Sequence, residues 1–325
     1  MTKQIPRLRI FAGPNGSGKS TIIKAVRQTT HNGRPIDFGA YINADDIAQE
    51  LKSGVFSFTP YQLDVDKKKI LSFAETSGLL HKDFTLALLR DAFTISLKGM
   101  LHLKNSAIAD HLSQLVARYL REALLAQGRR FTFETVFSHP SNIDIMRRAA
   151  EAGYKVYLYF VSTESPEINK YRVAVRVTQH GHDVPPGKID SRYHRSLDLM
   201  HGAAQVAYQA FFFDNSKNDE PFRLVAHFKR QGDKKYWDEI DKANLPKWFI
   251  RYYLNKVVQP VIPSFAPSRR CAPAFKTGFG TIIYGSCTWA RRILLKRWLY
   301  AARNNNLLNL NRKLSLSSWQ ESWLK

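Results

Sequence analysis

The chain has 325 residues, 44% of them hydrophobic and 12% aromatic, which excludes an intrinsically disordered protein. Its two cysteines, Cys271 and Cys287, imply neither a disulfide framework nor a zinc site. No apolar run reaches the length of a membrane span, and no secretory signal precedes the first predicted strand. We therefore expect a cytoplasmic globular protein.

The formal net charge of +22 is unevenly distributed along the chain. Residues 246–325 contain 14 Lys and Arg but a single acid, Glu321. A basic surface attracts small anionic molecules as well as nucleic acids. The charge alone therefore does not distinguish an enzyme with an anionic substrate from a nucleic-acid-binding protein.

The clearest motif is IFAGPNGSGKST, residues 10–21, which contains the P-loop pattern G-x-x-x-x-G-K-[ST]. Residues 7–13 predict a buried strand and residues 21–28 the start of a helix, the arrangement that a P-loop requires. Backbone N–H groups of such a loop bind phosphate oxygens. We predict that Lys19 contacts the β- and γ-phosphates of ATP and that the Ser20 hydroxyl binds Mg²⁺. The predicted ATP-binding residues are Gly13, Pro14, Asn15, Gly16, Ser17, Gly18, Lys19, Ser20 and Thr21.

Residues 40–51, AYINADDIAQEL, predict a short strand that ends near Asn43 and then a helix. Carboxylates after a strand of an open α/β sheet lie where ligands bind, although an aspartate there also serves as a helix cap. We interpret Asp46 as the cap and leave both roles open for Asp45. The following residues, 52–109, show mixed apolar spacing and predict helices only.

Helices and strands alternate in the rest of the chain, as expected for a parallel sheet. A helix at 110–127 precedes a strand at 129–137, and a helix at 141–152 precedes a strand at 154–162. Residues 211–229 predict an antiparallel edge hairpin. Glu134 lies near the end of the predicted strand at 129–137 among aromatic residues, where an unpaired carboxylate is costly, so we favour a functional role for it. The predicted fold is α/β, a P-loop kinase-like, doubly wound, mainly parallel sheet flanked by helices.

Two arginine clusters follow. Arg172 and Arg176 lie four residues apart on one predicted helix face, and Arg192 and Arg195 come after a Gly- and Pro-rich turn at 181–187. Mobile guanidinium groups on either side of a hinge suit a lid that neutralises charge during phosphoryl transfer. The alternative is a solvated basic helix.

Taken together, these motifs resemble the zeta toxin family, bacterial kinases of nucleotide sugars. The resemblance rests on AGPNGSGKST, YINADDIA, FTFETVFS, GYKVYLYFV, the block RVAVRVTQHGHDVP with KIDSRYHRSL, and FFFDNS, in this order. It covers about residues 5–230, except for 52–109. It implies ATP-dependent phosphorylation of the 3′-hydroxyl of a UDP-N-acetyl-sugar such as UDP-N-acetylglucosamine, with an antitoxin protein as partner.

The resemblance also implies roles for individual residues. Asp45 corresponds to the catalytic base, and Lys19 belongs to the catalytic set. Glu134 corresponds to the substrate-binding glutamate, with Thr135 beside it. Family members often carry a threonine where this chain has Val136.

Arg172, Arg176 and Arg192 are the candidates for the lid arginines that contact phosphates. His180 occupies a position at which relatives usually have a glycine. A residue with a side chain there predicts a stiffer loop.

The C-terminal part differs in composition. We predict a kinase domain at 1–245, with a variable helical insertion at 52–109, and a basic extension at 246–325 that is in part disordered. Residues 289–303 fit a basic amphipathic helix. An arm that binds nucleic acid or a membrane surface is one interpretation, but we favour a segment outside the enzyme because no binding fold is recognisable.

Overall fold

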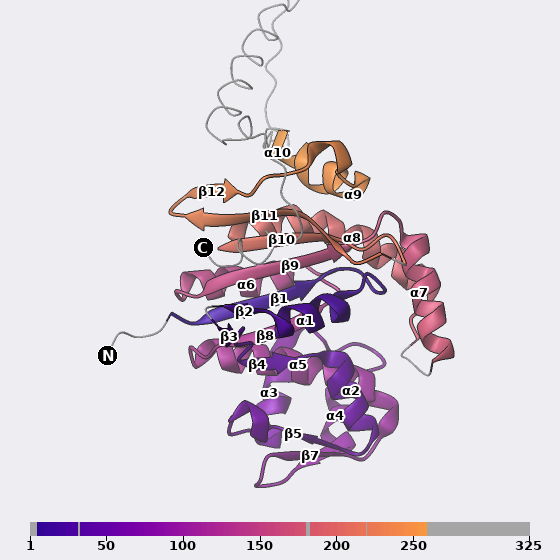
Figure 1. Cartoon of the computed structure of the whole chain (residues 1–325). Coiled ribbons are helices and arrows are strands. Elements are labelled where there is room, and N and C mark those ends of the chain that lie inside the picture. Colours follow the sequence, from indigo (N-terminus) through magenta and orange to yellow (C-terminus); the bar gives the residue numbers. More distant parts are fainter. Residues whose placement is uncertain (1–4, 32, 180–182, 219, 259–325) are drawn as a thin grey trace, which may run out of the picture.

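The structure is a computed structural model that describes residues 5–31, 33–179, 183–218 and 220–258. Both cysteines, the predicted helix at 289–303, His180 and most of the predicted C-terminal extension lie outside these residues. Within the described residues, no helix has both the length and the apolar character needed to cross a membrane. Figure 1 shows a central sheet with helices on both sides.

The elements alternate as predicted in the sheet-forming parts of the chain. The strands are β1 Arg7–Ala12, β2 Thr30–His31, β3 Arg34–Pro35, β4 Ala40–Ile42, β5 Val55–Ser57, β6 Phe93–Ile95, β7 Met100–Leu103, β8 Phe131–Thr135, β9 Lys155–Ser162, β10 Gln209–Asp214, β11 Arg223–Gln231 and β12 Lys234–Trp237. The α-helices are α1 Lys19–Gln28, α2 Ala44–Lys52, α3 Lys67–Ser77, α4 Leu86–Ala92, α5 Ala109–Ala126, α6 Ser141–Glu151, α7 Pro166–Thr178, α8 Pro186–Val206, α9 Lys247–Phe249 and α10 Asn255–Val258. Shorter helical turns are η1 Thr59–Tyr61, η2 Ser106–Ile108, η3 Lys242–Asn244 and the π-helical η4 Ile250–Leu254.

The main sheet has seven strands in the order β12-β11-β10-β9-β1-β8-β4. Strands β4, β8, β1, β9 and β10 run parallel to one another. Strands β11 and β12 pair antiparallel and form the edge of the sheet. The α/β fold class and the antiparallel edge are therefore confirmed, with β12 as an additional strand. Because β1 lies between β8 and β9, the loop after β1 opens at the point where the strand order reverses, which is where such sheets bind ligands.

The two faces of the sheet are covered by different helices. One face packs against α1 through a cluster that includes Phe11, Ile22 and Phe211. The other face packs against α5, α6 and α8 through a larger core that includes Phe133 and Met200. Continuous apolar segments such as β9 are expected for strands that are buried on both faces.

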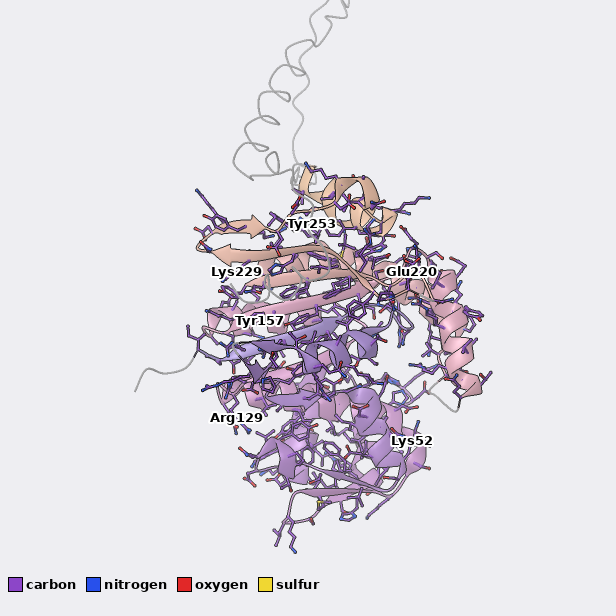
Figure 2. The ribbon with its side chains drawn as sticks, in the orientation of Figure 1. Lys52, Arg129, Tyr157, Glu220, Lys229 and Tyr253 are labelled. Atoms are coloured by element: carbon purple, nitrogen blue, oxygen red, sulfur yellow. The ribbon has the colours of Figure 1, made fainter. Side chains whose placement is uncertain are left out.

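The predicted helical insertion at 52–109 differs from expectation. It contains α3 and α4, but also a three-stranded antiparallel sheet in the order β5-β7-β6. Apolar residues at mixed spacing are compatible with short strands as well as with helices, and the cross-strand partners become known only in the folded chain. Lys52 forms an ion pair with Asp110 of α5 at 2.7 Å, and Arg129 donates to the Tyr61 carbonyl, which ties this region to the main sheet. Figure 2 labels Lys52 and Arg129.

Residues just beyond the predicted domain boundary at 245 pack on the main core. Trp248, Phe249 and Tyr253 are buried, and the Phe249 and Tyr253 rings stack at 5.1 Å. Apolar burial of this kind stabilises the sheet layer beneath. The division of the chain at residue 245 stays a prediction, but this short helical segment contributes to the same core as the sheet.

Candidate active site

The P-loop runs from the end of β1 to the start of α1, as predicted. Gly13, Gly16 and Gly18 have φ angles of 149°, 74° and 93°, which favour glycine. A β-carbon on Gly13 would overlap the carbonyl oxygen of Val161, and one on Gly16 would lie 2.6 Å from the Asn169 carbonyl oxygen. The loop is therefore wedged against neighbouring backbone, and these glycines are required by space as well as by conformation.

The loop has the features of an anion-binding cradle. Asn15 Oδ1 and Ser17 Oγ are buried, and neither has a hydrogen-bond partner among the described residues. The first turn of α1 contains no acidic residue, so the positive end of its dipole is not neutralised there. Buried polar groups normally have partners. The loop residues therefore fit the phosphates of ATP, which would supply partners and meet the helix dipole.

Lys19 and Glu134 face each other at the base of this loop. Lys19 Nζ donates to the carbonyl oxygens of Gly13 and Pro14 at 3.0 and 3.1 Å and lies 3.8 Å from Glu134 Oε1. The two side chains are 9% and 12% exposed. Burial lowers the pKa of Lys19, and the Glu134 carboxylate opposes this effect. Burial raises the pKa of Glu134, with Lys19 again acting in the opposite direction. The partly buried carboxylate of Glu134, which would be unfavourable if unpaired, is thus paired with Lys19 of the P-loop.

Tyr41 of β4 and Asn43, the N-cap of α2, lie beside the other oxygen of Glu134. The Tyr41 hydroxyl donates to Glu134 Oε2 at 3.2 Å, and Asn43 Nδ2 lies 3.5 Å from the same atom. Burial, followed by the charge of Glu134, raises the pKa of Tyr41, so the hydroxyl stays protonated and able to donate. Tyr41 has no local signal in the sequence, because its partner is 93 residues away in the chain.

Asp45 and Asp46 both lie in the first turn of α2 and are exposed. The interpretation of Asp46 as the helix cap is wrong. Asn43 is the N-cap, and its side chain accepts a hydrogen bond from the Asp45 N–H at 2.9 Å. An asparagine that ends a strand can cap the next helix as well as an aspartate can. Asp45 is therefore not required as a cap, and its carboxylate is available at the edge of the sheet that carries the P-loop.

The charge of Asp45 affects the pKa values of two other site residues, Lys19 and Arg192. It raises the pKa of Lys19, after the effects of burial and Glu134. It also acts on Arg192, whose pKa is lowered by burial and by Arg195 and raised by Asp45. The structure therefore brings Asp45, Lys19, Glu134 and Arg192 into one electrostatic neighbourhood.

The two predicted arginines of α7 have different surroundings. Arg176 lies near Lys19, since its charge contributes to lowering the pKa of that lysine. Arg172 instead binds the loop after β10: it donates to the Asn215 and Lys217 carbonyls at 2.7 and 3.0 Å, and to Asn218 Oδ1 at 2.9 and 2.8 Å. Arg176 therefore lies near Lys19 of the P-loop and Arg192 near Asp45, whereas Arg172 holds a neighbouring loop.

That neighbouring loop supports the P-loop. Asn215 Nδ2 donates to the Ser17 carbonyl oxygen at 2.9 Å, so Arg172 acts on the P-loop through Asn215. The motif FFFDNS contains Asn215, but the contact spans 198 positions of the chain and has no local signal. The sequence analysis therefore missed Asn215 as a site residue.

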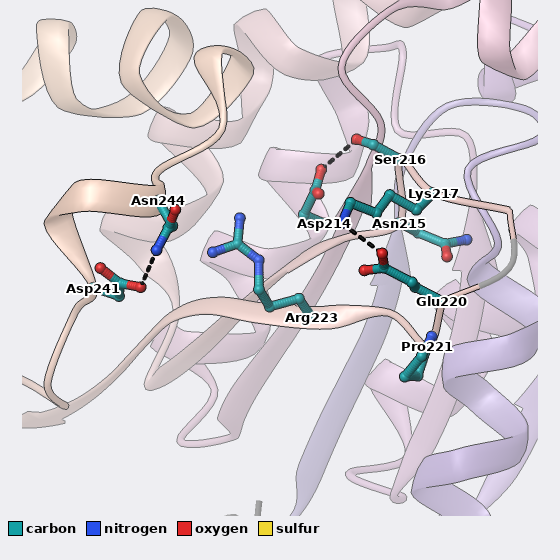
Figure 3. A pocket seen from close by; sticks show the side chains of 9 residues that line it. All are labelled: Asp214, Asn215, Ser216, Lys217, Glu220, Pro221, Arg223, Asp241 and Asn244. Carbon is teal, nitrogen blue, oxygen red and sulfur yellow. Dashed lines mark hydrogen bonds and ion pairs between the residues drawn. The ribbon is translucent and has the colours of Figure 1, made fainter. Parts of the chain in front are cut away.

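A cavity of about 340 Å³ opens on the other side of this loop (Figure 3). Its acidic side chains are held by other groups: Asp214 accepts from Ser216 and Trp248 at 2.6 and 2.9 Å, and Glu220 pairs with Lys217 at 2.6 Å. The lining does not include Lys19, Glu134 or Asp45. The charged cluster at the P-loop, and not this cavity, is therefore the candidate reaction centre.

Thr135 was predicted to bind substrate. Its hydroxyl accepts a hydrogen bond from the Phe137 N–H at 3.1 Å and lies 3.5 Å from Asn142 Oδ1. Phe137 has a φ of 59°, a conformation uncommon for a residue with a side chain. In the structure Thr135 thus stabilises the turn after β8, and its role toward a substrate stays a prediction.

Ser20 and Thr21 lie in the first turn of α1 and are exposed. Within the described residues, no group of three or more His, Cys, Asp and Glu side chains could hold a metal ion. Mg²⁺ commonly binds through one or two protein oxygens together with phosphate oxygens and water. The Ser20 hydroxyl beside the phosphate-binding loop fits this kind of site, and Ser20 as the Mg²⁺ ligand stays a prediction.

Comparisons with known proteins support the resemblance. The family model for zeta toxin matches residues 97–216, less than half of the chain. The match begins inside the segment 52–109 that the sequence analysis left unmatched, and it ends before the antiparallel edge strands. A search of curated proteins gave no match. The resemblance to the zeta toxin family is confirmed over the matched residues.

Several solved structures align with part of the chain. The AvrRxo1-ORF1:AvrRxo1-ORF2 complex with sulphate ions aligns with a TM-score of 0.44 and 16% identity, covering 74% of this chain and 62% of that chain. The same complex with ATP gives 0.44 and 16%, covering 74% and 61%. A structure from the PezAT toxin–antitoxin system of Streptococcus pneumoniae gives 0.38 and 13%, covering 68% and 72%. The present chain thus spans less than two thirds of the AvrRxo1 chains that it matches.

Proposed function

We propose that this protein is a kinase that transfers the γ-phosphoryl group of ATP to the 3′-hydroxyl of a UDP-N-acetyl-sugar, with UDP-N-acetylglucosamine as the first acceptor to test. The observation that carries the proposal is the convergence of Lys19, Glu134 and Asp45 beside the P-loop. The reaction type follows from these residues and from the family match. The acceptor follows from the family resemblance.

Each residue has a distinct task in this proposal. ATP bound at the P-loop would supply the phosphoryl group, and Mg²⁺ bound at Ser20 would neutralise part of its charge. Lys19 moves from the Gly13 and Pro14 carbonyls toward phosphate oxygens. Glu134, held by Tyr41, accepts a hydrogen bond from the acceptor and orients it. Little covalent chemistry is required of the protein, so positioning and charge stabilisation account for most of the catalysis.

Asp45 is the proposed general base. Its carboxylate is exposed and lies within electrostatic reach of Lys19 and Arg192. It would take the proton of the acceptor hydroxyl as the new O–P bond forms. Arg176 and Arg192 flank residues 180–182, and we propose that they close on the transferred phosphoryl group. Arg172 would then support the P-loop through the loop at 215–218 without contacting the phosphates.

The direct test is an assay with ATP, Mg²⁺ and UDP-N-acetylglucosamine in which a singly phosphorylated sugar nucleotide is sought by mass spectrometry. Asp45→Asn should lower kcat by about 10²- to 10⁴-fold, the usual contribution of a general base, with ATP affinity unchanged. The matched control is Asp46→Asn, since Asp46 occupies the next position of the same helical turn and is also exposed. This control should keep activity within about threefold.

Three outcomes would be decisive. Absence of product from protein that binds ATP contradicts the proposed acceptor. Product with another alcohol in a panel of acceptors keeps the kinase and replaces the acceptor. Equal losses in Asp45→Asn and Asp46→Asn would remove Asp45 from the role of base.

The zeta toxin resemblance also leads us to propose an antitoxin protein as partner. Expression of the wild-type chain should inhibit bacterial growth, and Asp45→Asn should relieve the inhibition. Growth inhibition of the same strength by both proteins would separate toxicity from phosphoryl transfer.

A further inference from the structure

A small cavity between α5 and α6 collects several arginine side chains. It has a volume of about 70 Å³, and its lining includes Arg118 and Arg121 of α5 and Ser141 and Arg148 of α6. These helices cover the face of the sheet opposite to α1. The sequence analysis assigned no role to any of these residues.

The acids in this region are already paired with other arginines. NH1 and NH2 of Arg148 each donate a hydrogen bond to one carboxylate oxygen of Glu122 at 2.7 Å, which makes a bidentate ion pair. Asp144 pairs with Arg147 at 3.0 Å. The carboxylates that line the cavity are therefore engaged by Arg147 and Arg148. They form no ion pair with Arg118 or Arg121 of α5.

Neither Arg118 nor Arg121 forms an ion pair within the described part of the chain. Arg121 has neutral partners only: Nε donates to the Ala117 carbonyl at 3.1 Å, NH1 lies 3.4 Å from Asn142 Oδ1, and the guanidinium lies 4.8 Å from the centre of the Phe133 ring. Arg118 is partly buried, and no side-chain hydrogen bond of it is found among the described residues.

Glu122, the carboxylate of the lining nearest in the chain to these two arginines, is already engaged by Arg148. Burial, followed by the charge of Arg118, lowers the pKa of Arg121 to about 10, while the charge of Glu122 acts in the opposite direction. Arginine remains charged at neutral pH even so. The arrangement of Arg118 and Arg121 is that of a site whose counter-ion comes from outside the chain.

We propose that this cavity binds a phosphate group and that the group belongs to the acceptor of phosphoryl transfer, an inference that rests on the proposed function. Planar guanidinium groups match the oxygens of a phosphate. The cavity volume of about 70 Å³ is comparable to that of one phosphate group and much smaller than that of a whole nucleotide.

Asn142 contacts both a residue of the cavity lining and a residue next to Glu134. Asn142 Oδ1 accepts from Arg121 NH1 at 3.4 Å and lies 3.5 Å from the Thr135 hydroxyl. Thr135 directly follows Glu134, which pairs with Lys19. A nucleotide-sugar acceptor carries both an alcohol and a diphosphate, so one molecule can place its hydroxyl at Glu134 and a phosphate near α5.

The first experiment measures binding of inorganic phosphate to the full chain by ³¹P NMR titration, without any need for catalysis. Phosphate bound at the P-loop contributes equally to wild type and variants, so the difference between them isolates the new site. Arg118→Gln should weaken the second binding event about tenfold or more, as expected for loss of a charge-assisted contact. Arg90→Gln is the control, because Arg90 is exposed on α4 and absent from the cavity lining.

The second experiment identifies the source of the phosphate. With the acceptor established by the assay above, Arg118→Gln should raise its KM about tenfold or more and leave the KM for ATP unchanged. Loss of phosphate binding in Arg118→Gln without a change in acceptor KM would support the site but assign it to free phosphate, overturning the acceptor part of the proposal. Identical titrations for wild type, Arg118→Gln and Arg121→Lys would overturn the site itself, whether or not the protein proves to be a sugar-nucleotide kinase.

Discussion

The pair formed by Lys19 and Glu134 allows a quantitative test of how the site is held together. The two charged atoms are 3.8 Å apart, and both side chains are nearly buried. Two unit charges at this distance attract each other by about 4 kcal/mol at an effective dielectric constant of about 20. Desolvation of both groups opposes this attraction, so the pair as a whole contributes less to the free energy of folding.

Removal of one partner should therefore cost more than removal of both. Lys19→Met leaves a buried carboxylate and Glu134→Gln leaves a buried ammonium, and each should lower the free energy of unfolding by roughly 2–4 kcal/mol. The double variant should lose much less than the sum of the two single losses. We expect a coupling free energy of roughly 2–3 kcal/mol, below the Coulomb value because the Tyr41 hydroxyl also stabilises the carboxylate.

The same pair predicts a pH dependence with a definite sign. Burial already raises the pKa of Glu134 above its value in the unfolded chain, and Lys19 opposes that rise. In Lys19→Met the pKa of Glu134 should rise further. A group with a raised folded-state pKa stabilises the fold below its unfolded pKa, and this contribution is lost as the pH rises through the folded pKa. Lys19→Met should therefore lose stability, relative to wild type, as the pH increases from about 5 to about 8.

Urea unfolding of the wild type, the two single variants and the double variant at these two pH values measures both effects. The double variant serves as control for the pH dependence, because it has no carboxylate at position 134. Additivity of the single losses within about 0.5 kcal/mol would refute the coupling. A Lys19→Met protein whose stability relative to wild type does not fall between the two pH values would refute the assignment of the buried carboxylate.

Three further predictions concern the support of the site. Asn215→Ala removes the hydrogen bond to the Ser17 carbonyl and should weaken ATP binding by roughly fivefold, measurable by calorimetry, with kcat for bound ATP little changed; an unaltered Kd would show that the contact is dispensable. Gly13→Ala would place a β-carbon on the Val161 carbonyl oxygen and should abolish ATP binding and lower the Tm, whereas retained nucleotide binding would contradict the wedged geometry of the loop. Phe249→Ala should lower the free energy of unfolding by about 3–5 kcal/mol, since this ring is fully buried, and a loss below about 1 kcal/mol would show that the segment after residue 245 is not part of the core.

The phosphate-binding part of this protein was determined by the sequence itself. The spacing of glycines, Lys19 and Ser20 specifies a tight turn between a strand and a helix, and the alternation of apolar segments specifies a parallel sheet. Both features depend on residues that are close in the chain, where backbone conformation and hydrophobic periodicity act directly. The position of Asp45 after a strand could be predicted for the same reason.

Contacts between distant residues were decided only by the tertiary structure. The hydrogen bond of Tyr41 to Glu134 and that of Asn215 to Ser17 join residues 93 and 198 positions apart. The three-stranded sheet in the segment 52–109 also depends on pairing that no local pattern specifies. Burial and charge pairing arise from packing of the whole chain, which is why the arginine pair on α5 and the distinct roles of Arg172 and Arg176 became visible only in the folded protein.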